Sequence, residues 1–290
     1  EIRLSLVGSE MCIRDRASAL DKIKAAADAN NADTATALAD FVAAGVTGVT
    51  ADNLAAVSSA LNSAGVNGAA ADTTAEVQAI VDAINAIKAN ADGTANNNAT
   101  NPTQLQYEAI GVTGIDSEAE LGLLGDVIDA KPATAVGTTA QVQALADAVQ
   151  AVQAGTATVA QLEALGVTGV TADNLKAVQA ALLTAPSIGS SSALASVVSG
   201  AVTAFNSAST AVAEFAEDNG AAKPAPTAAN YTDMGVSGIG GAGQPTVAQI
   251  NSALATASVT GEKANTAAEV QAIVDGFKAI VSNADGTANN

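Results

Sequence analysis

A short glycine pattern, Gly-Val-Thr/Ser-Gly followed by Val or Ile, occurs four times and constrains the fold more than any other feature. The copies begin at Gly45, Gly111, Gly166 and Gly235. Two longer stretches also recur: residues 73–82 return nearly unchanged as 266–275, and residues 90–97 return unchanged as 283–290. Self-similarity at intervals of about 55 to 70 residues is typical of repeat architectures. The chain is therefore predicted to be a series of related units.

The residues around the first glycine of each copy predict the end of a helix. A large side chain stands four residues before this glycine and a valine follows it directly. The four large side chains are Phe41, Tyr107, Leu162 and Tyr231. A Schellman motif needs this hydrophobic pair and a glycine in the left-handed conformation. The second glycine permits a further tight turn.

The residues after the motif predict the start of the next helix. Thr50 and Thr171 are good N-cap residues, and each lies between a valine and a leucine at the spacing of a hydrophobic staple. Asp116 takes the cap position in the second copy. In the fourth copy, residues 240–245 are inserted before Thr246, which we expect to cap its helix.

A third helix is predicted in each unit from a capping box. The pairs Thr73 with Glu76, Thr138 with Gln141, and Thr266 with Glu269 fit this pattern. Apolar residues follow at helical spacing, and we expect Glu76, Gln78 and Asp82 on a solvated face. The third unit differs, because residues 191–216 predict a longer helix interrupted at Ser199-Gly200.

These signals together predict an all-α fold, organised as a tandem array of short three-helix bundles. The expected boundaries are residues 17–32 as the last helix of a preceding repeat, 33–101 as repeat 1 with a linker, 102–156 as repeat 2, 157–225 as repeat 3 with a linker, and 226–290 as repeat 4 with a terminal linker. We expect the chain to be a piece of a longer reading frame.

Composition supports helices with a thin core. Of the 290 residues 49% are hydrophobic, but only 2% are aromatic, and about a quarter are alanine, which loses no side-chain entropy in a helix. Each unit is near the lower size limit for independent folding. We expect a stability of only a few kcal/mol per unit from apolar burial at about 25 cal/mol per Å².

Composition also excludes several functions. The chain has no His or Trp and a net charge of -18, and Cys12 is its single cysteine. Catalysis by Ser/His/Asp or Cys/His arrangements is excluded, as are disulfides and cysteine-based zinc sites. The negative charge argues against nucleic acid as a partner. No apolar run is long enough to span a membrane. We predict a protein that is not an enzyme, with no catalytic, cofactor-binding or metal-binding residues and no cofactor.

Three sequence patterns resemble functional sites, but each has a plainer structural explanation. Asp92-Gly93 and Asp285-Gly286 suggest calcium loops, but position 1 of each would be Lys88 or Val281, so plain Asp-Gly turns are expected. The glycine pairs of the motif lack the other residues of a phosphate-binding loop. Carboxylates near helix starts are expected from the helix dipole alone and do not require a hydrolase site; these are Asp52, Asp116, Glu118, Glu120 and Asp173.

The first sixteen residues differ from the rest. They contain every arginine and the only cysteine, and the run from Leu6 to Asp15 resembles the translation of a sequencing adapter. The resemblance implies that residues 1–16 are an artefact outside the natural fold.

The string from Leu165 to Leu175, followed elsewhere by Thr-x-x-Glu/Gln-Val-Gln-Ala, resembles the tandem alanine-rich helical repeats of large bacterial surface and adhesin-like proteins. The resemblance implies an extracellular or cell-surface array of spacers or contact modules. A more distant likeness is to albumin-binding three-helix modules, carried by Tyr231, residues 235–237 and residues 266–270.

The sequence thus predicts a non-catalytic spacer or adhesive repeat segment of an exported bacterial surface protein. Its partners would be host or surface proteins or polysaccharides. The alternative is a specific protein-binding module of the albumin-binding kind. The two differ in whether an exposed apolar patch recurs from unit to unit.

Overall fold

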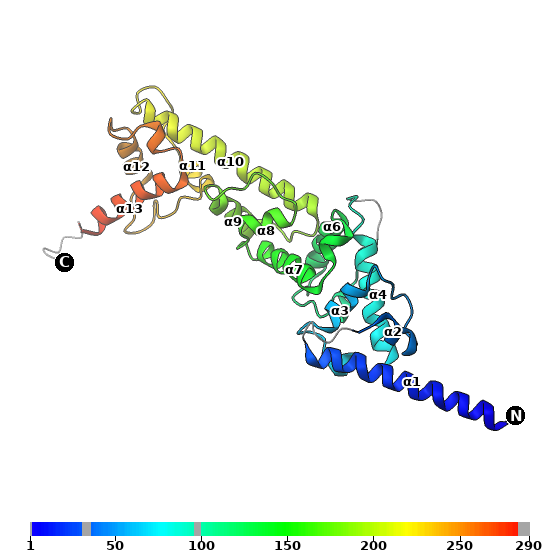
Figure 1. Cartoon of the computed structure of the whole chain (residues 1–290). Helices are drawn as coiled ribbons and strands as arrows, with labels where there is room; N and C mark the ends of the chain where they lie inside the picture. Colours follow the sequence, from blue (N-terminus) through cyan, green and yellow to red (C-terminus); the bar gives the residue numbers. More distant parts are fainter. Residues whose placement is uncertain (1, 31–35, 96–99, 284–290) are drawn as a thin grey trace. The chain divides into compact units, whose positions relative to one another are not determined.

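The chain is all-helical, as the sequence predicts. A computed structural model describes residues 2–30, 36–95 and 100–283, and these ranges contain thirteen α-helices, three short 3-10 helices and no strand (Figure 1). The chain divides into two compact units. The first consists of residues 1–150 with 187–191, and the second of residues 151–186 with 192–290. The division into four repeats remains a prediction.

The first unit consists of one long helix followed by two groups of short helices. Its elements are α1 (Ile2–Ala29), α2 (Leu38–Ala43), α3 (Leu54–Leu61), η1 (Gly68–Ala70), α4 (Thr74–Asn90), α5 (Gln104–Ala109), α6 (Glu118–Asp129), η2 (Ala133–Val136) and α7 (Thr139–Gln153), whose last three residues fall in the second unit. Helix α1 packs on α2, α3 and η1, and α4 packs in the same way on α5, α6 and η2.

The second unit has its own apolar core. Its elements are α8 (Val159–Ala164), α9 (Leu175–Thr184), α10 (Ser191–Glu217), α11 (Ala228–Asp233), α12 (Val247–Leu254), η3 (Gly261–Lys263) and α13 (Ala267–Asn283). The core draws its side chains from α9 to α13, with Phe205, Phe215, Tyr231, Ile250 and Val274 among the largest. Below, "segment" means the three helices around one motif copy: α2–α4, α5–α7, α8–α10 and α11–α13.

Each first helix ends in the Schellman motif that the sequence predicts. The amide of the valine after the first glycine donates to the carbonyl of the large residue, as from Val46 to Phe41 at 2.9 Å. The same bond joins Val112 to Tyr107, Val167 to Leu162 and Val236 to Tyr231. The first glycine of every copy has a φ between +72° and +84°. The large residues are at most 1% exposed, so they lie in the core.

The predicted start of the second helix is wrong in detail. Helices α3 and α9 begin at Leu54 and Leu175, after a turn, and not directly after Thr50 and Thr171. The reason is an asparagine in each turn. The Asn53 side chain accepts from the amide of Thr50 at 2.7 Å and donates to the carbonyl of Gly48 at 2.8 Å. Asn174 makes the same two bonds, to Thr171 and Gly169.

Capping boxes begin most of the remaining helices. The predicted boxes of α4 and α13 are present, and Thr246 caps α12 as expected. At α7 the Thr138 hydroxyl accepts from the amide of Gln141 and donates to its side chain. In the second copy, Ser117 and not Asp116 is the N-cap, because Glu120 stands three residues after Ser117 and completes the box. The first helices of segments two to four are capped by boxes that the sequence analysis missed, at Thr103, Thr158 and Thr227.

Helix α10 is continuous, contrary to the predicted interruption at Ser199-Gly200. One glycine in a helix costs about 1 kcal/mol relative to alanine. A stripe of buried apolar residues, including Leu194, Val198 and Phe205, runs along both sides of Gly200 and outweighs that cost. Helix α1 is also continuous from Ile2 to Ala29; residues 10–18 are exposed, and Ala19 is buried.

We expect the substitution Glu76→Gln to reduce the acid sensitivity of the fold. Glu76 accepts from the side chain and the amide of Thr73 at 2.8 and 2.9 Å, and the side-chain bond is the main cause that lowers the pKa of Glu76. A lowered pKa stabilises the fold above the ordinary carboxyl pKa, and this contribution is lost as pH falls through the lowered value. Glutamine keeps the box, as Gln106 does in α5.

Thermal denaturation followed by circular dichroism at neutral pH and at about pH 3, below the ordinary glutamate pKa, measures this effect. The loss on acidification should be smaller in the variant. The control Glu163→Gln removes an exposed charge outside any capping box. An equal acid loss in Glu76→Gln and in the parent protein would contradict the prediction.

Candidate functional site

The glycine turn is held on its own third helix by a glutamine clamp. The Gln78 side chain accepts from the amide of Thr47 at 2.8 Å and donates to the carbonyl of the same residue at 3.0 Å. Its NH₂ group also donates to Asp82, one helical turn further on, at 2.8 Å. Because a carboxylate can only accept, Asp82 fixes which end of the amide is the NH₂ group and which end accepts from Thr47. The side chain thus pairs with the backbone as a strand would.

The same clamp is present in two other segments. Gln143 binds Thr113 and Asp147, and Gln271 binds Ser237 and Asp275, with all distances between 2.8 and 3.1 Å. Gln78 and Asp82 were expected to be merely solvated, so sequence analysis missed this role. The available signal was the string Val-Gln-Ala with an aspartate four residues after the glutamine, which occurs in all three third helices.

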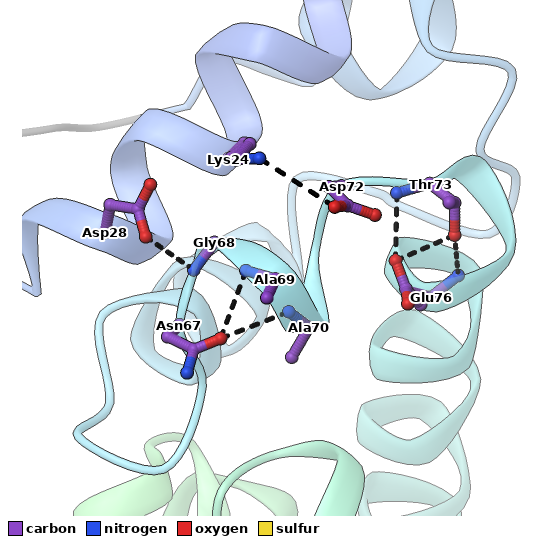
Figure 2. Close-up of polar contacts among 9 residues, drawn as sticks. All are labelled: Lys24, Asp28, Asn67, Gly68, Ala69, Ala70, Asp72, Thr73 and Glu76. Atoms are coloured by element: carbon purple, nitrogen blue, oxygen red, sulfur yellow. Dashed lines mark hydrogen bonds and ion pairs between the residues drawn. The ribbon is translucent and has the colours of Figure 1, made fainter.

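Helix α1 makes a polar joint with the first segment (Figure 2). Asp28 accepts from the amide of Gly68, the first residue of η1, at 2.8 Å. A Cβ at position 68 would lie 2.4 Å from the Asp28 carboxylate oxygens, so only glycine allows this approach. Lys24 pairs with Asp72 at 3.8 Å. Lys22 donates to Asp40 at 2.9 Å, and this bond is the main cause that lowers the pKa of Asp40.

A second joint links the first and second segments. The Ser59 hydroxyl of α3 accepts from the amide of Thr139, the first residue of α7, at 3.1 Å. Ser63 donates to the carbonyl of Ile110, just before the motif glycine, at 3.3 Å. Gly65 and Gly111 touch, because a Cβ on Gly65 would lie 2.6 Å from the Gly111 Cα. A groove of about 530 Å³ lies along this joint.

A third joint links α9 to the fourth segment. Asp173 accepts from the amide of Ala267, the first residue of α13, at 2.9 Å. A Cβ on Gly235 would lie 2.9 Å from the backbone nitrogen of Ala177. A groove of about 560 Å³ follows the joint and is lined mainly by small side chains, with Lys176, Gln271 and Asp275 as its larger polar groups. In the second and third joints, one segment therefore caps the third helix of the next.

The tyrosines at the helix stops belong to the core. Burial raises the pKa of both Tyr107 and Tyr231. The Tyr231 hydroxyl donates to Asn251, which in turn donates to the carbonyl of Pro226 at 2.9 Å. The Tyr107 hydroxyl is buried and has no hydrogen-bond partner among the described residues. Neither phenol has the exposure that a catalytic acid or base requires.

Neither the Asp-Gly turn nor the glycine motif forms a binding loop. Asp92 accepts from the amide of Thr94 at 2.8 Å, and Gly93 has a φ of +82°, which is the expected Asp-Gly turn. Asp285-Gly286 lies outside the described residues. In the motif, the amides of Gly45, Val46 and Thr47 already donate to protein acceptors, so they form no open cradle for a phosphate.

The candidate carboxylates are not brought together. Glu120 completes the cap of α6 and Asp173 belongs to the third joint, whereas Asp52, Asp116 and Glu118 are exposed. No group of three or more His, Cys, Asp or Glu residues in the described part of the chain could hold a metal ion. No helix within these same ranges combines the length and apolar character needed to cross a bilayer.

Among the residues whose burial is described, the large apolar side chains with the greatest exposure do not recur at one position in every segment. Leu38 and Val42 of α2 are 38% and 68% exposed. Their counterparts in α5, at the same distance before the motif glycine, are Gln104 and Glu108. Leu105, 76% exposed, corresponds to an alanine in the other three segments. The exposed apolar residues therefore do not form one shared surface.

Comparison of the chain with models of known protein families, with curated proteins and with solved structures found no match.

Two motif glycines in the second unit should differ in their tolerance of alanine. Gly166 has a φ of +84°, and no atom lies within 4 Å of the place that an alanine Cβ would occupy. Gly166→Ala should therefore lose only the about 1–2 kcal/mol that a side chain costs in the left-handed conformation. Gly235→Ala adds overlap with the backbone of α9, which we expect to cost roughly 1–3 kcal/mol more. Urea denaturation of both variants measures the difference. Equal losses would show that the close approach of Gly235 to α9 does not affect stability.

We expect Gln271→Glu to destabilise the second unit in a manner that depends on pH. A carboxylate at this position cannot donate to Ser237 or Asp275 and places two negative charges one helical turn apart. Its folded pKa would lie above the unfolded value, so the destabilisation is present at neutral pH and is relieved as pH falls. The loss at pH 7 should be about 1–2 kcal/mol in urea denaturation. Gln271→Met, which lacks the charge, is the control and should show a loss that does not change with pH.

Proposed function

We propose that this chain is a non-catalytic spacer or adhesive segment of a large exported bacterial surface protein. In this proposal, its helices form a tandem array of short three-helix bundles, one around each copy of the glycine motif. The proposed location is extracellular or at the cell surface. It rests on the resemblance to alanine-rich surface repeats and on the absence of cysteine after Cys12.

The joints between successive segments support an array. Asp28, Ser59 and Asp173 each accept an amide hydrogen from the start of a helical element in the segment that follows. A glycine also permits a close approach at each joint: of the Asp28 side chain to Gly68 at the first, and of two backbones at Gly65 and Gly235 in the others. Within each unit, such specific contacts fix how neighbouring parts of the chain meet, which a mechanical spacer needs.

The surface supports a spacer over a dedicated binding module, and this observation carries the proposal. A binding module repeated along a chain would present the same apolar patch in each copy, usually of several hundred Å². Here the exposed apolar residues, among them Val42, Leu105 and Leu183, occupy different positions in their segments. A net charge of -18 keeps such a surface soluble.

The alternative is an albumin-binding type of module. The residues that carry this likeness are Tyr231, Gly235, Val236, Ser237 and residues 266–270. Tyr231 and Val236 are buried, Gly235 ends a helix, and Ser237 is held by the Gln271 clamp. The likeness is therefore accounted for by helix ends and turns, and these residues do not form an exposed contact surface.

Binding measurements with the full chain test the proposal. Immobilised chain is exposed to serum albumin and to cell-wall polysaccharide at concentrations up to about 10 μM, a range that covers specific protein interfaces. We expect no saturable binding of albumin. Saturable polysaccharide binding would select the adhesive form of the proposal, and its absence would select the spacer. Saturable albumin binding would overturn both in favour of the alternative.

A further inference from the structure

Helices α4 and α13 are near copies that differ in what covers them. Both have seventeen residues, and both begin with a capping box followed by Val-Gln-Ala-Ile-Val-Asp. Three residues form a stripe near the end of α4: Ala83, Ile87 and Asn90. The equivalent stripe of α13 is Gly276, Ile280 and Asn283. The spacing of three and four residues places each stripe on one face of its helix.

The α4 stripe is fully buried, and α4 packs on the second segment. Ala83, Ile87 and Asn90 are 0%, 1% and 2% exposed. Helix α4 packs against α5, α6 and η2, and the Asn90 side chain donates to the carbonyl of Gly125 in α6 at 2.9 Å. The next third helix, α7, has equivalents of the first two residues at Ala148 and Val152, which are also fully buried.

The α13 stripe is open. Ile280 is 62% exposed, and Gly276 and Asn283 are exposed as well. The face of α13 that carries Val270 and Val274 is buried in the core of its own segment, so the helix is anchored although its stripe is exposed. The same three positions are therefore covered in one copy of this helix and uncovered in the other.

We propose that the α13 stripe binds a further segment of the same kind as α5–α7, which would present a short helix, a second helix and a 3-10 turn. This deepens the proposed function and rests on it. We identify the occupant from the equivalent part of the chain. The α13 stripe corresponds to the α4 stripe, and residues 283–290, which begin at its asparagine, are identical to residues 90–97. That run leads from α4 directly into the segment that covers it.

The geometry of α4 specifies how the new segment would sit. Asn283 would donate to a backbone carbonyl of the incoming second helix, as Asn90 does to Gly125. Ile280 would be buried by the incoming segment in the way that Ile87 is buried in α4. A second complete copy of the chain does not offer this partner through its first two segments, because α1 already packs on α2, α3 and η1, and α4 on α5, α6 and η2.

The test extends the full chain by appending a copy of residues 98–156 directly after Asn290. This places a second α5–α7 segment behind α13 in the register in which the first one follows α4. Hydrogen exchange followed by mass spectrometry compares the amides of residues 277–283 in the extended and original chains. We expect exchange there to slow by at least about tenfold on extension.

Two controls make the test specific. Ile280→Asp should leave the original chain folded, since the side chain is exposed, but should abolish the added protection in the extended chain. An appended Gly/Ser sequence of equal length should give no protection.

Unchanged exchange across residues 277–283 overturns the proposal, whether or not the appended segment is itself protected. Concentration-dependent protection of α13 in the original chain would identify a second copy as the occupant and also overturn it.

This result is distinguishable from a failure of the proposed function. Albumin binding would remove the spacer role without changing exchange in α13. Unchanged exchange would overturn the proposed docking surface but would not affect the spacer role, which the binding measurements test separately.

Discussion

A left-handed glycine ends the first helix of every segment, and the remaining local geometry depends on where that helix stops. The glycine allows the amide of the following valine to reach back to a carbonyl five residues earlier, which draws the valine onto Phe41, Tyr107, Leu162 or Tyr231. The chain then turns again at the second glycine. Because the first helices have only six residues each, they would have little stability without this closure.

Polar side chains supply much of the order that larger apolar residues provide in other proteins. Alanine contributes about a quarter of the chain and buries little area per residue. The glutamine clamps, the asparagines at Asn53 and Asn174 and the capping boxes each satisfy backbone groups that a small core cannot shield. Their lengths and donor patterns also select one arrangement of turn and helix over others that would bury a similar area.

The sequence predicted those features that arise from residues close together in the chain. Schellman stops and capping boxes join residues three to five positions apart, so their patterns are visible directly. The start at Thr50 failed because Thr50 and Asn53 are both good capping residues, and the asparagine bonds in both directions along the turn. The continuous α10 shows burial outweighing the cost of Gly200. The joints could not be predicted, because a bond such as that between Asp173 and Ala267 spans 94 residues and leaves no periodic signal.

The joints change what counts as a transferable module in this chain. Ser59 lies in one segment and the amide that it caps, at Thr139, begins the third helix of the next. A chimaera cut in the polar connection between them would separate the two halves of this contact and bring together partners that had not been selected for each other. A cut in the loop between a second and a third helix also separates Ser59 from Thr139, and in the first segment it further divides Gln78 from the turn that it holds. For recombination in nature or in the laboratory, the exchangeable part is therefore a pair of adjoining segments that carries both Ser59 and Thr139, and a single segment is harder to move.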